Sequence, residues 1–308
     1  MNPMPPPRAL FVGRSTLDAL YRLDCLPEED TKVYARAFHA APGGPALNAA
    51  ITHSLLGGEA MLVSAVGRGP WAAVVRAELA RHGIALLDLA AGTDYETPLV
   101  TALLADSSGS RTAVNPPLAQ TKLQCLSGSW EAASGVLPGG PPPVILSDGF
   151  HLAETLPFLA ACRAAGSVLC LDGGSWKPGT SELAPLLTAA ICSERFQIPG
   201  LGDDPASIFA WFAERGVPSV ALTRGAKPIL GWEKRSGWER GRRFEIEVEK
   251  VAAADTLGAG DVLHGAFCYF YARQPEFEPA LRRASRIATL SCQSLGTQAW
   301  AAQSVPEP

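Results

Sequence analysis

The sequence predicts an α/β fold in which a central, mostly parallel sheet is covered by helices on both faces. Short apolar runs alternate with stretches of helical spacing along nearly the whole chain. The first run, residues 9–12, is entirely apolar and is stopped by Gly13, which is typical of a buried parallel strand with a functional loop at its carboxyl end. Two helices are also expected to begin directly after glycines, at residues 43–44 and 258–260.

The composition is that of a globular protein that acts on small molecules. The 308 residues are 47% hydrophobic and 18% charged, which is enough to bury a large core. The formal net charge is -4 and there is no long run of Lys or Arg, so a nucleic-acid surface or a polybasic membrane patch is not expected. No stretch is apolar over the length of a signal peptide or a membrane span, so we expect a cytoplasmic protein.

The cysteines and histidines do not predict a metal site. Seven cysteines, with no C-x-x-C pair, are expected to be reduced core residues. The five histidines form no i,i+4 pair, so no zinc site is visible. His264 lies one helical turn after Asp261, and we expect it to be a polar residue at the edge of a cleft.

Residues 14–39 and 99–115 are expected to be loops and short extended pieces. Asp18 lies in the predicted loop 14–18, where a carboxylate beyond a central strand can accept hydrogen bonds from sugar hydroxyls. Alternation at 21–23 and 32–37 predicts extended segments. Residues 99–104 and 111–115 predict a hairpin around the turn 106–110, so these pieces fit a small second sheet.

A helix is predicted after Gly43 and Gly44, extending to residue 56 because Leu47, Ile51 and Leu55 recur at four-residue steps. A glycine pair before a helix offers uncovered backbone amides to a ligand, and Asn48 in the first turn can both donate and accept hydrogen bonds. Taken alone, this segment is explained equally well as an ordinary loop followed by a helix.

The remaining chain supplies the alternation that defines the large sheet. Strands are predicted at 61–66, 144–147, 168–172, 189–192, 219–223, 228–232 and 243–249, and helices at 71–82, 155–165, 207–215 and 284–293. Such a sheet binds ligands at the carboxyl ends of its strands.

A second glycine-led helix, with Gly258, Ala259 and Gly260 before its first apolar residue, predicts an anion site. The first N–H groups of a helix lack intrahelical partners and carry the positive end of its dipole. Asp261 follows at once; it is either a helix cap or a base that takes a proton from a hydroxyl while the amides stabilise a phosphoryl group.

The run Asp255-Thr256-Leu257-Gly258-Ala259-Gly260-Asp261 resembles the C-terminal signature of the ribokinase-like (PfkB) carbohydrate kinases, and the glycine pair 43–44 resembles their N-terminal motif. The resemblance implies one kinase domain over 1–308, a ribokinase-like three-layer sandwich of Rossmann type. It also implies a β-sheet lid at about 14–40 and 95–117. In the family the last Asp is the catalytic base and the Gly-Ala-Gly amides form the anion hole.

The resemblance further implies an ATP-dependent kinase that uses Mg²⁺ and a sugar or sugar-like substrate. The residues expected to contact the acceptor are Asp18, Lys32, Gly43, Gly44, Asn48, Arg111 and Asn115. Those expected on the nucleotide side are Ser193, Glu194, Thr223, Arg224, Gly225, Thr256, Gly258 and Gly260, with helix 284–293 beside the adenine. Asp255 is the expected ligand of a K⁺ ion, and a homodimer through the lid sheet is an assembly that the resemblance allows.

Two departures from the common family pattern are visible: the run Gly-Arg-Gly-Pro-Trp at 67–71, where the family often carries Gly-x-Asp, and the residues after the predicted strand 189–192. Ser193 and Glu194 stand where the family has an Asn-x-x-Glu element that organises water around Mg²⁺. The segments 171–177 and 192–194 place the chain nearer the fructose-like and sulfofructose-like branch.

A neutral ketose is the first expectation for the acceptor and an anionic sugar the second, because the lid cations Lys32 and Arg111 suit an anion but also fit a solvated surface. A nucleoside kinase and a non-catalytic sugar or nucleotide sensor remain the alternatives.

Overall fold

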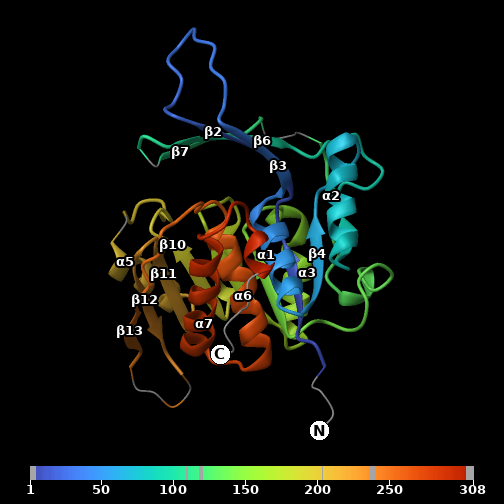
Figure 1. Cartoon of the computed structure of the whole chain (residues 1–308). Coiled ribbons are helices and arrows are strands. Elements are labelled where there is room, and N and C mark those ends of the chain that lie inside the picture. The colour runs from blue at the N-terminus through green and yellow to red at the C-terminus, as the bar shows by residue number, and fades with distance from the viewer. Residues whose placement is uncertain are drawn as a thin grey trace.

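The computed structural model describes residues 5–108, 110–117, 121–202, 204–235, 237 and 240–302. Within this part of the chain, a nine-stranded sheet carries helices on both faces and a four-stranded sheet stands apart from it (Figure 1). The large sheet has the order β13-β12-β11-β10-β9-β8-β1-β4-β5. The predicted α/β fold, with a mostly parallel sheet and a smaller second sheet, is confirmed.

The strands of the large sheet are short and mostly buried on both faces. Their bounds are β1 Arg8–Val12, β4 Glu59–Ser64, β5 Ala85–Asp88, β8 Val144–Ser147, β9 Val168–Gly173, β10 Ala189–Ser193, β11 Ser219–Arg224, β12 Lys227–Glu233 and β13 Arg242–Ile246. The pairs from β5 to β11 are parallel, whereas β12 is antiparallel to both of its neighbours. The carboxyl ends of the parallel strands therefore meet at one edge.

Helices bury apolar stripes against the two faces of this sheet. Their bounds are α1 Pro45–Leu55, α2 Pro70–Arg81, α3 Leu152–Ala164, α4 Thr180–Leu183, α5 Pro205–Glu214, α6 Ala259–Arg273 and α7 Phe277–Ser291, with single 3₁₀ turns at Trp130–Ala132, Ala184–Leu186 and Ala299–Ala302. One core contains α1, α2, α6 and α7, and the other contains α3, α4 and α5.

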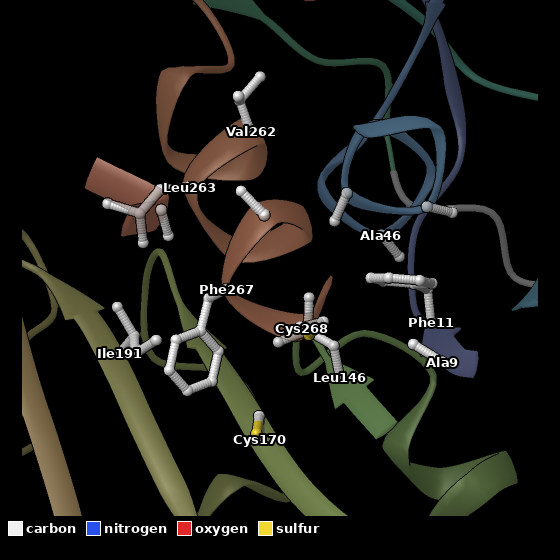
Figure 2. Close-up of a cluster of buried hydrophobic side chains, with 14 of the residues drawn as sticks. Ala9, Phe11, Ala46, Leu146, Cys170, Ile191, Val262, Leu263, Phe267 and Cys268 are labelled. Carbon is white, nitrogen blue, oxygen red and sulfur yellow. The ribbon is translucent and has the colours of Figure 1, made fainter. Parts of the chain in front are cut away.

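Helix α6 lies centrally between α1 and α7, over strands β8 to β10. Figure 2 shows Phe267 and Cys268 of α6 pointing toward the strands that carry Leu146, Cys170 and Ile191. Phe267 and Cys268 are fully buried, and burying such side chains contributes roughly 1.5–3 kcal/mol each. This packing fixes the start of α6 relative to the carboxyl ends of the strands.

The small sheet has the order β3-β2-β6-β7, with β2 Thr16–Leu23, β3 Ala37–Gly43, β6 Leu99–Ala105 and β7 Ser110–Val114. It lies above the large sheet in Figure 1. The predicted hairpin formed by β6 and β7 is confirmed.

Two expectations about this region are wrong. Asp18 lies inside strand β2, paired with Ala41, and not in a loop, because the strand begins only three residues after Gly13. Residues 32–36 are not a strand: the chain from 24 to 36 loops out before β3 begins, and Lys32 and Tyr34 have no strand beside them.

The described residues contain no helix that is both long and apolar enough to cross a membrane, and no cluster of three or more His, Cys, Asp or Glu side chains arranged for a metal. All seven cysteines are free, but only four of them are buried; Cys25 and Cys125 are exposed. The prediction of reduced cysteines agrees with this structure, while the prediction of core positions holds for the majority only.

Candidate active site

The start of α6 is built around Gly258, which occupies the N-cap position with φ 71°, a left-handed conformation that favours glycine. A Cβ at this position would overlap the methyl group of Thr297. Because α6 begins at Ala259, the amides of its first turn face the open end of the helix, where the dipole is positive. The predicted helix N-terminus directly after Gly258 is therefore present.

Asp261 lies in this first turn and is held by a side chain from another helix. Asn48 Nδ2 donates a hydrogen bond of 2.8 Å to Asp261 Oδ2, and Thr297 Oγ1 lies 3.4 Å from Asn48 Oδ1. The N-cap position belongs to Gly258, and α6 has no side-chain cap. Asp261 is thus placed by Asn48, and it does not act as the N-cap.

The protonation chemistry of Asp261 suits a base. The pKa of its carboxyl is raised to about 7, first by burial and then by the nearby Asp172 carboxylate, while the Asn48 hydrogen bond and His264 oppose the rise. A carboxylate with a pKa near neutrality both accepts a proton well and is available in its basic form.

Asp18 faces the glycine pair that precedes α1. Thr16 Oγ1 donates a hydrogen bond of 2.6 Å to Asp18 Oδ1, and burial is the main cause that raises the pKa of this carboxyl. A Cβ at Gly43 would overlap the Asp18 carboxylate. Gly44 has φ 98°, and a Cβ at this position would overlap the carbonyl oxygen of Arg14. The structure therefore brings Asp18, Gly43, Gly44 and Asn48 together.

Asp148, which the sequence reasoning missed, organises the floor of this region. Its carboxylate accepts hydrogen bonds from the amides of Arg14 (2.8 Å), Ala46 (3.2 Å) and Phe150 (2.9 Å). Burial raises its pKa to about 7. The sequence could have indicated Asp148 by its position, directly after the apolar strand β8 and before Gly149.

A second missed feature is a pair of cations against one aromatic ring. The Phe150 ring centroid lies 5.2 Å from Arg14 Cζ and 4.6 Å from Lys177 Nζ. Arg14 Nη1 also donates to Asn115 Oδ1 at 3.1 Å, which joins the end of β7 to the loop after β1. Arg14 and Lys177 are half-buried and form no ion pair within the described residues.

The two lid cations predicted from the sequence are placed differently. Arg111 lies exposed on β7, where its charge lowers the pKa of Asp18 slightly against the effect of burial. Lys32 is exposed in the loop between β2 and β3, with Nζ 6.0 Å from the Tyr34 ring centroid. This loop projects away from the large sheet in Figure 1, so the structure does not bring Lys32 to Asp18.

Of the residues expected on the nucleotide side, Ser193, Glu194, Thr223 and Arg224 lie at the carboxyl ends of β10 and β11, where Ser193 pairs with Thr223. Ser193 Oγ donates to Gly174 O at 3.1 Å, and Thr223 Oγ1 donates to Cys192 O at 3.3 Å. Glu194 pairs with Lys227 at 3.5 Å, a cation that the sequence reasoning did not single out.

The turn from β11 to β12 follows directly. Arg224 Nε donates to Pro228 O at 2.8 Å, and Gly225 has φ 61° in the turn itself. A groove of about 280 Å³ opens along α7 beside residues 247–249, lined by Ser285 and Thr289.

Asp255 ties the loop before α6 to the C-terminal segment. Its carboxylate accepts hydrogen bonds from the amides of Leu257 (2.8 Å) and Gly296 (3.0 Å). Thr256 is exposed in the same loop, and its carbonyl accepts from the Ala259 amide at 3.4 Å. The residues of the signature therefore form one continuous turn.

The expectation that His264 lies at a cleft edge is wrong. Its side chain is only 4% exposed, because this face of α6 packs onto the large sheet. Nδ1 lies 2.7 Å from Gly260 O, and Nε2 lies 3.1 Å from Ile191 O.

Comparison with known proteins agrees with this geometry. Residues 9–303 match the family described as pfkB family carbohydrate kinase. Bacillus subtilis ribokinase is 24% identical over 300 residues, covering 93% of both chains, and a nucleoside kinase from Methanothermobacter thermautotrophicus is 24% identical, covering 94% of this chain and 90% of its own.

Solved structures share the fold. Arabidopsis thaliana ribokinase complexed with ribose and ATP has a TM-score of 0.69 at 19% identity, covering 95% of this chain and 94% of that one. An Escherichia coli structure in complex with ATP and Mg²⁺ has a TM-score of 0.72 at 17% identity, covering 94% of both. Since the family match spans nearly the whole chain, this chain belongs to the pfkB family of carbohydrate kinases.

Proposed function

We propose that the protein transfers the γ-phosphoryl group of ATP to a primary hydroxyl of a sugar or sugar-like acceptor, with Asp261 as the base. The observation that carries this proposal is the half-buried Asp261 carboxylate, with a pKa of about 7, in the first turn of α6. Asp261 takes the hydroxyl proton while the hydroxyl oxygen forms its bond to the γ-phosphorus. The bond between that phosphorus and the bridging oxygen of ADP breaks, and ADP leaves.

The amides of Gly258, Ala259 and Gly260 stabilise the charge on the transferring group. They belong to the turn at the positive end of the α6 dipole and need no reorganisation during the reaction. Asn48 keeps the base oriented through its 2.8 Å hydrogen bond.

ATP is proposed to lie along β10, β11 and the groove beside α7. The structural neighbours solved with ATP, one of them also with Mg²⁺, support ATP as the nucleotide. Mg²⁺ bridges and neutralises phosphate oxygens in such reactions, and Ser193 and Glu194 are the residues that would reach it through water. Asp255 is the proposed neighbour of a K⁺ ion, whose charge would order the adjacent turn.

A ketose-like sugar of the fructose-like or sulfofructose-like branch is the first proposed acceptor. The carboxylate of Asp18, the amide of Asn48 and the bare glycine pair at 43–44 form a polar cradle that suits several hydroxyl groups. The small sheet, over 14–40 and 95–117, is the proposed lid that excludes water when the acceptor is bound.

An anionic sugar is the second candidate acceptor, and one observation favours it. Arg14 and Lys177 present two half-buried positive charges against Phe150, next to the Asp148 carboxylate. A carboxylate or sulfonate on the acceptor would find charge-assisted donors there.

The measurement that separates the two acceptors is kcat/KM for matched neutral and anionic ketoses in the wild type, in Lys177→Ala and in Lys32→Ala. If the acceptor is anionic, the wild type prefers it at least about tenfold, which is about 1.4 kcal/mol, and only Lys177→Ala removes the preference. Equal use of both sugars in all three proteins supports the neutral acceptor.

Two alternative functions, a nucleoside kinase and a non-catalytic sensor, are tested by measuring turnover. A nucleoside kinase is supported by the similarity to such an enzyme over nearly the full chain, and a non-catalytic sensor by the altered Mg²⁺ element. A screen of ADP release over ketoses, sugar acids, sulfosugars, pentoses and nucleosides identifies the acceptor class. A complete absence of ADP release in the presence of bound ATP and sugar would favour the sensor.

The role of Asp261 is tested with Asp261→Asn, which keeps the shape and the contact to Asn48 but cannot accept the proton. We expect kcat to fall by about two to four orders of magnitude, while ATP and acceptor binding measured by calorimetry change little. Retention of a near-normal kcat would remove Asp261 from the chemistry.

A further inference from the structure

The ring of His264 makes two hydrogen bonds to groups that can only accept. Nδ1 lies 2.7 Å from the carbonyl oxygen of Gly260, and Nε2 lies 3.1 Å from the carbonyl oxygen of Ile191. A neutral imidazole carries one N–H and one bare nitrogen, so it would set a lone pair against one of these oxygens. Both contacts are hydrogen bonds only when both ring nitrogens carry a proton.

The counter-charge for such an imidazolium is already in place. Asp172 Oδ2, at the end of β9, lies 3.3 Å from His264 Nδ1, and both side chains are nearly inaccessible to solvent. A buried cation without a partner would be costly, and a carboxylate at this distance offsets much of that cost.

The other buried histidine of the same helical layer shows the opposite arrangement. In His53 of α1, Nε2 lies 3.0 Å from Pro7 O, whereas Nδ1 has no partner among the described residues. Burial lowers the pKa of His53 to about 4. His53 is therefore neutral, although the backbone groups of Pro7 and Gly265 raise its pKa against the effect of burial, and it forms no ion pair with a carboxylate within the described chain.

From this contrast we propose that His264 is a buried imidazolium, paired with Asp172, that clamps the Gly258–Gly260 turn onto the large sheet. The inference rests on the proposed role of Asp261 as the base. His264 is a positioning residue: one N–H holds the carbonyl of Gly260 in the anion-hole turn, and the other holds the carbonyl of Ile191 in β10. The turn and the sheet are thereby fixed to each other by a single rigid ring.

The charge has a second effect, on Asp261. Two carboxylates face this region, Asp172 from β9 and Asp261 from α6 itself. The thiols of Cys192 and Cys268 are also close, but burial raises their pKa values well above the usual range, so they are neutral. His264 lowers the pKa of Asp261 and Asp172 raises it, after the larger effect of burial. The His264 charge thus offsets part of the rise in the pKa of the base that burial and Asp172 cause.

The first test is the protonation state of the resting protein, which needs no substrate. In ¹⁵N–¹H NMR spectra of the imidazole rings at pH 7.5, His264 should show two protonated nitrogens, and His53 one protonated and one bare nitrogen as the internal control. A spectrum in which His264 carries only one ring proton overturns the proposal.

The second test uses charge variants in turnover. In His264→Gln we expect kcat to fall about tenfold to a hundredfold with an acceptor KM within about threefold, because the acceptor cradle is untouched. The acid limb of the pH dependence of kcat should move up by about one pH unit in His264→Gln, and down in Asp172→Asn, because the two substitutions remove opposite charges near the base.

His53→Gln is the matched control, since it removes a buried histidine of the same layer; it should lower the unfolding temperature without moving the acid limb. The proposal is overturned if the acid limb of the pH dependence of kcat stays in place in both variants, or moves in the same direction in His264→Gln and Asp172→Asn. His264 would then only contribute packing. If the wild type phosphorylates no acceptor at all, the proposed function fails, while the NMR result still decides the state of His264.

Discussion

At the scale of single residues, the site gathers side chains that are far apart in the sequence. Asp261 is reached by Asn48 from α1, and Asn48 in turn by Thr297 near the C-terminus. Asp172 and Asp148 add negative charge at the ends of β9 and β8. The pKa of Asp261 is therefore set by burial and by the balance between its positively and negatively charged neighbours.

The raised pKa of Asp261 gives a prediction about activity and pH. The basic form is the carboxylate, so kcat should fall as the pH drops through about 7, by about tenfold per unit below it. The measurement is the pH dependence of kcat at saturating ATP and acceptor. A kcat that is flat between pH 5 and pH 7 would contradict it.

The same raised pKa predicts a cost in stability. A carboxyl whose pKa is raised on folding stabilises the native state in its protonated form, below the unfolded value, and this contribution is lost as the pH rises through about 7. Asp261→Asn has no charge to bury, so its unfolding temperature relative to the wild type should rise between pH 5 and pH 8. Thermal unfolding of both proteins across this range is the check; an unchanged difference would contradict it.

Residue-level prediction from the sequence succeeded where the signal was local. Gly258 and Asp261 lie in one turn, and the need for bare amides beside a carboxylate can be seen in the run itself. Asp148 and the pair formed by Asp172 and His264 could not be found in this way, because their roles depend on strands β8, β9 and β10 lying next to each other.

At the scale of elements, the close crossing of α1 and α6 places Asn48 against Asp261. Gly265 of α6 makes this approach possible, because a Cβ there would overlap the backbone oxygen of Ala49. The two helices that begin with glycine motifs are thus also held together by a glycine.

Gly265→Ala should therefore separate the helices and lower the free energy of unfolding by about 1–3 kcal/mol, with loss of kcat because Asn48 moves from Asp261. Gly260→Ala is the matched control for stability, since open space surrounds that position, and alanine favours the helix. Urea denaturation of both variants is the measurement. An unchanged midpoint for Gly265→Ala would show that the crossing tolerates a methyl group.

Strand boundaries were predicted to within one residue for β8, whose bounds match the prediction, and for β6 and β7. They failed in residues 32–36, where alternation is present but only the Arg36 amide is hydrogen-bonded to β2, at Arg22 O, before β3 begins. The prediction of a loop at Asp18 also failed, because β2 of the small sheet begins at Thr16, soon after β1 of the large sheet ends at Val12.

At the scale of the whole molecule, the small sheet carries a group of exposed apolar side chains. The ring centroids of Tyr21 and Phe38 lie 4.9 Å apart on adjacent strands, and the two residues are 37% and 59% exposed. Val33 and Tyr34 in the adjoining loop are also exposed. Exposed apolar groups clustered on one sheet are typical of an interface.

A homodimer through this sheet predicts that Phe38→Glu sediments as a monomer at a concentration where the wild type is dimeric. Val136→Glu, at an exposed apolar residue on a different part of the surface, is the control and should leave the dimer intact. Analytical ultracentrifugation decides, and a monomeric wild type would refute this assembly.

The links from Asp255 to Gly296 and from Asn48 to Thr297 have a consequence for synthesis of the chain on the ribosome. The turn at 258–260 and the asparagine that contacts Asp261 are both supported by residues 296 and 297. Every strand of the two sheets is made before these residues, so the sheets can assemble while the turn still lacks the two hydrogen bonds.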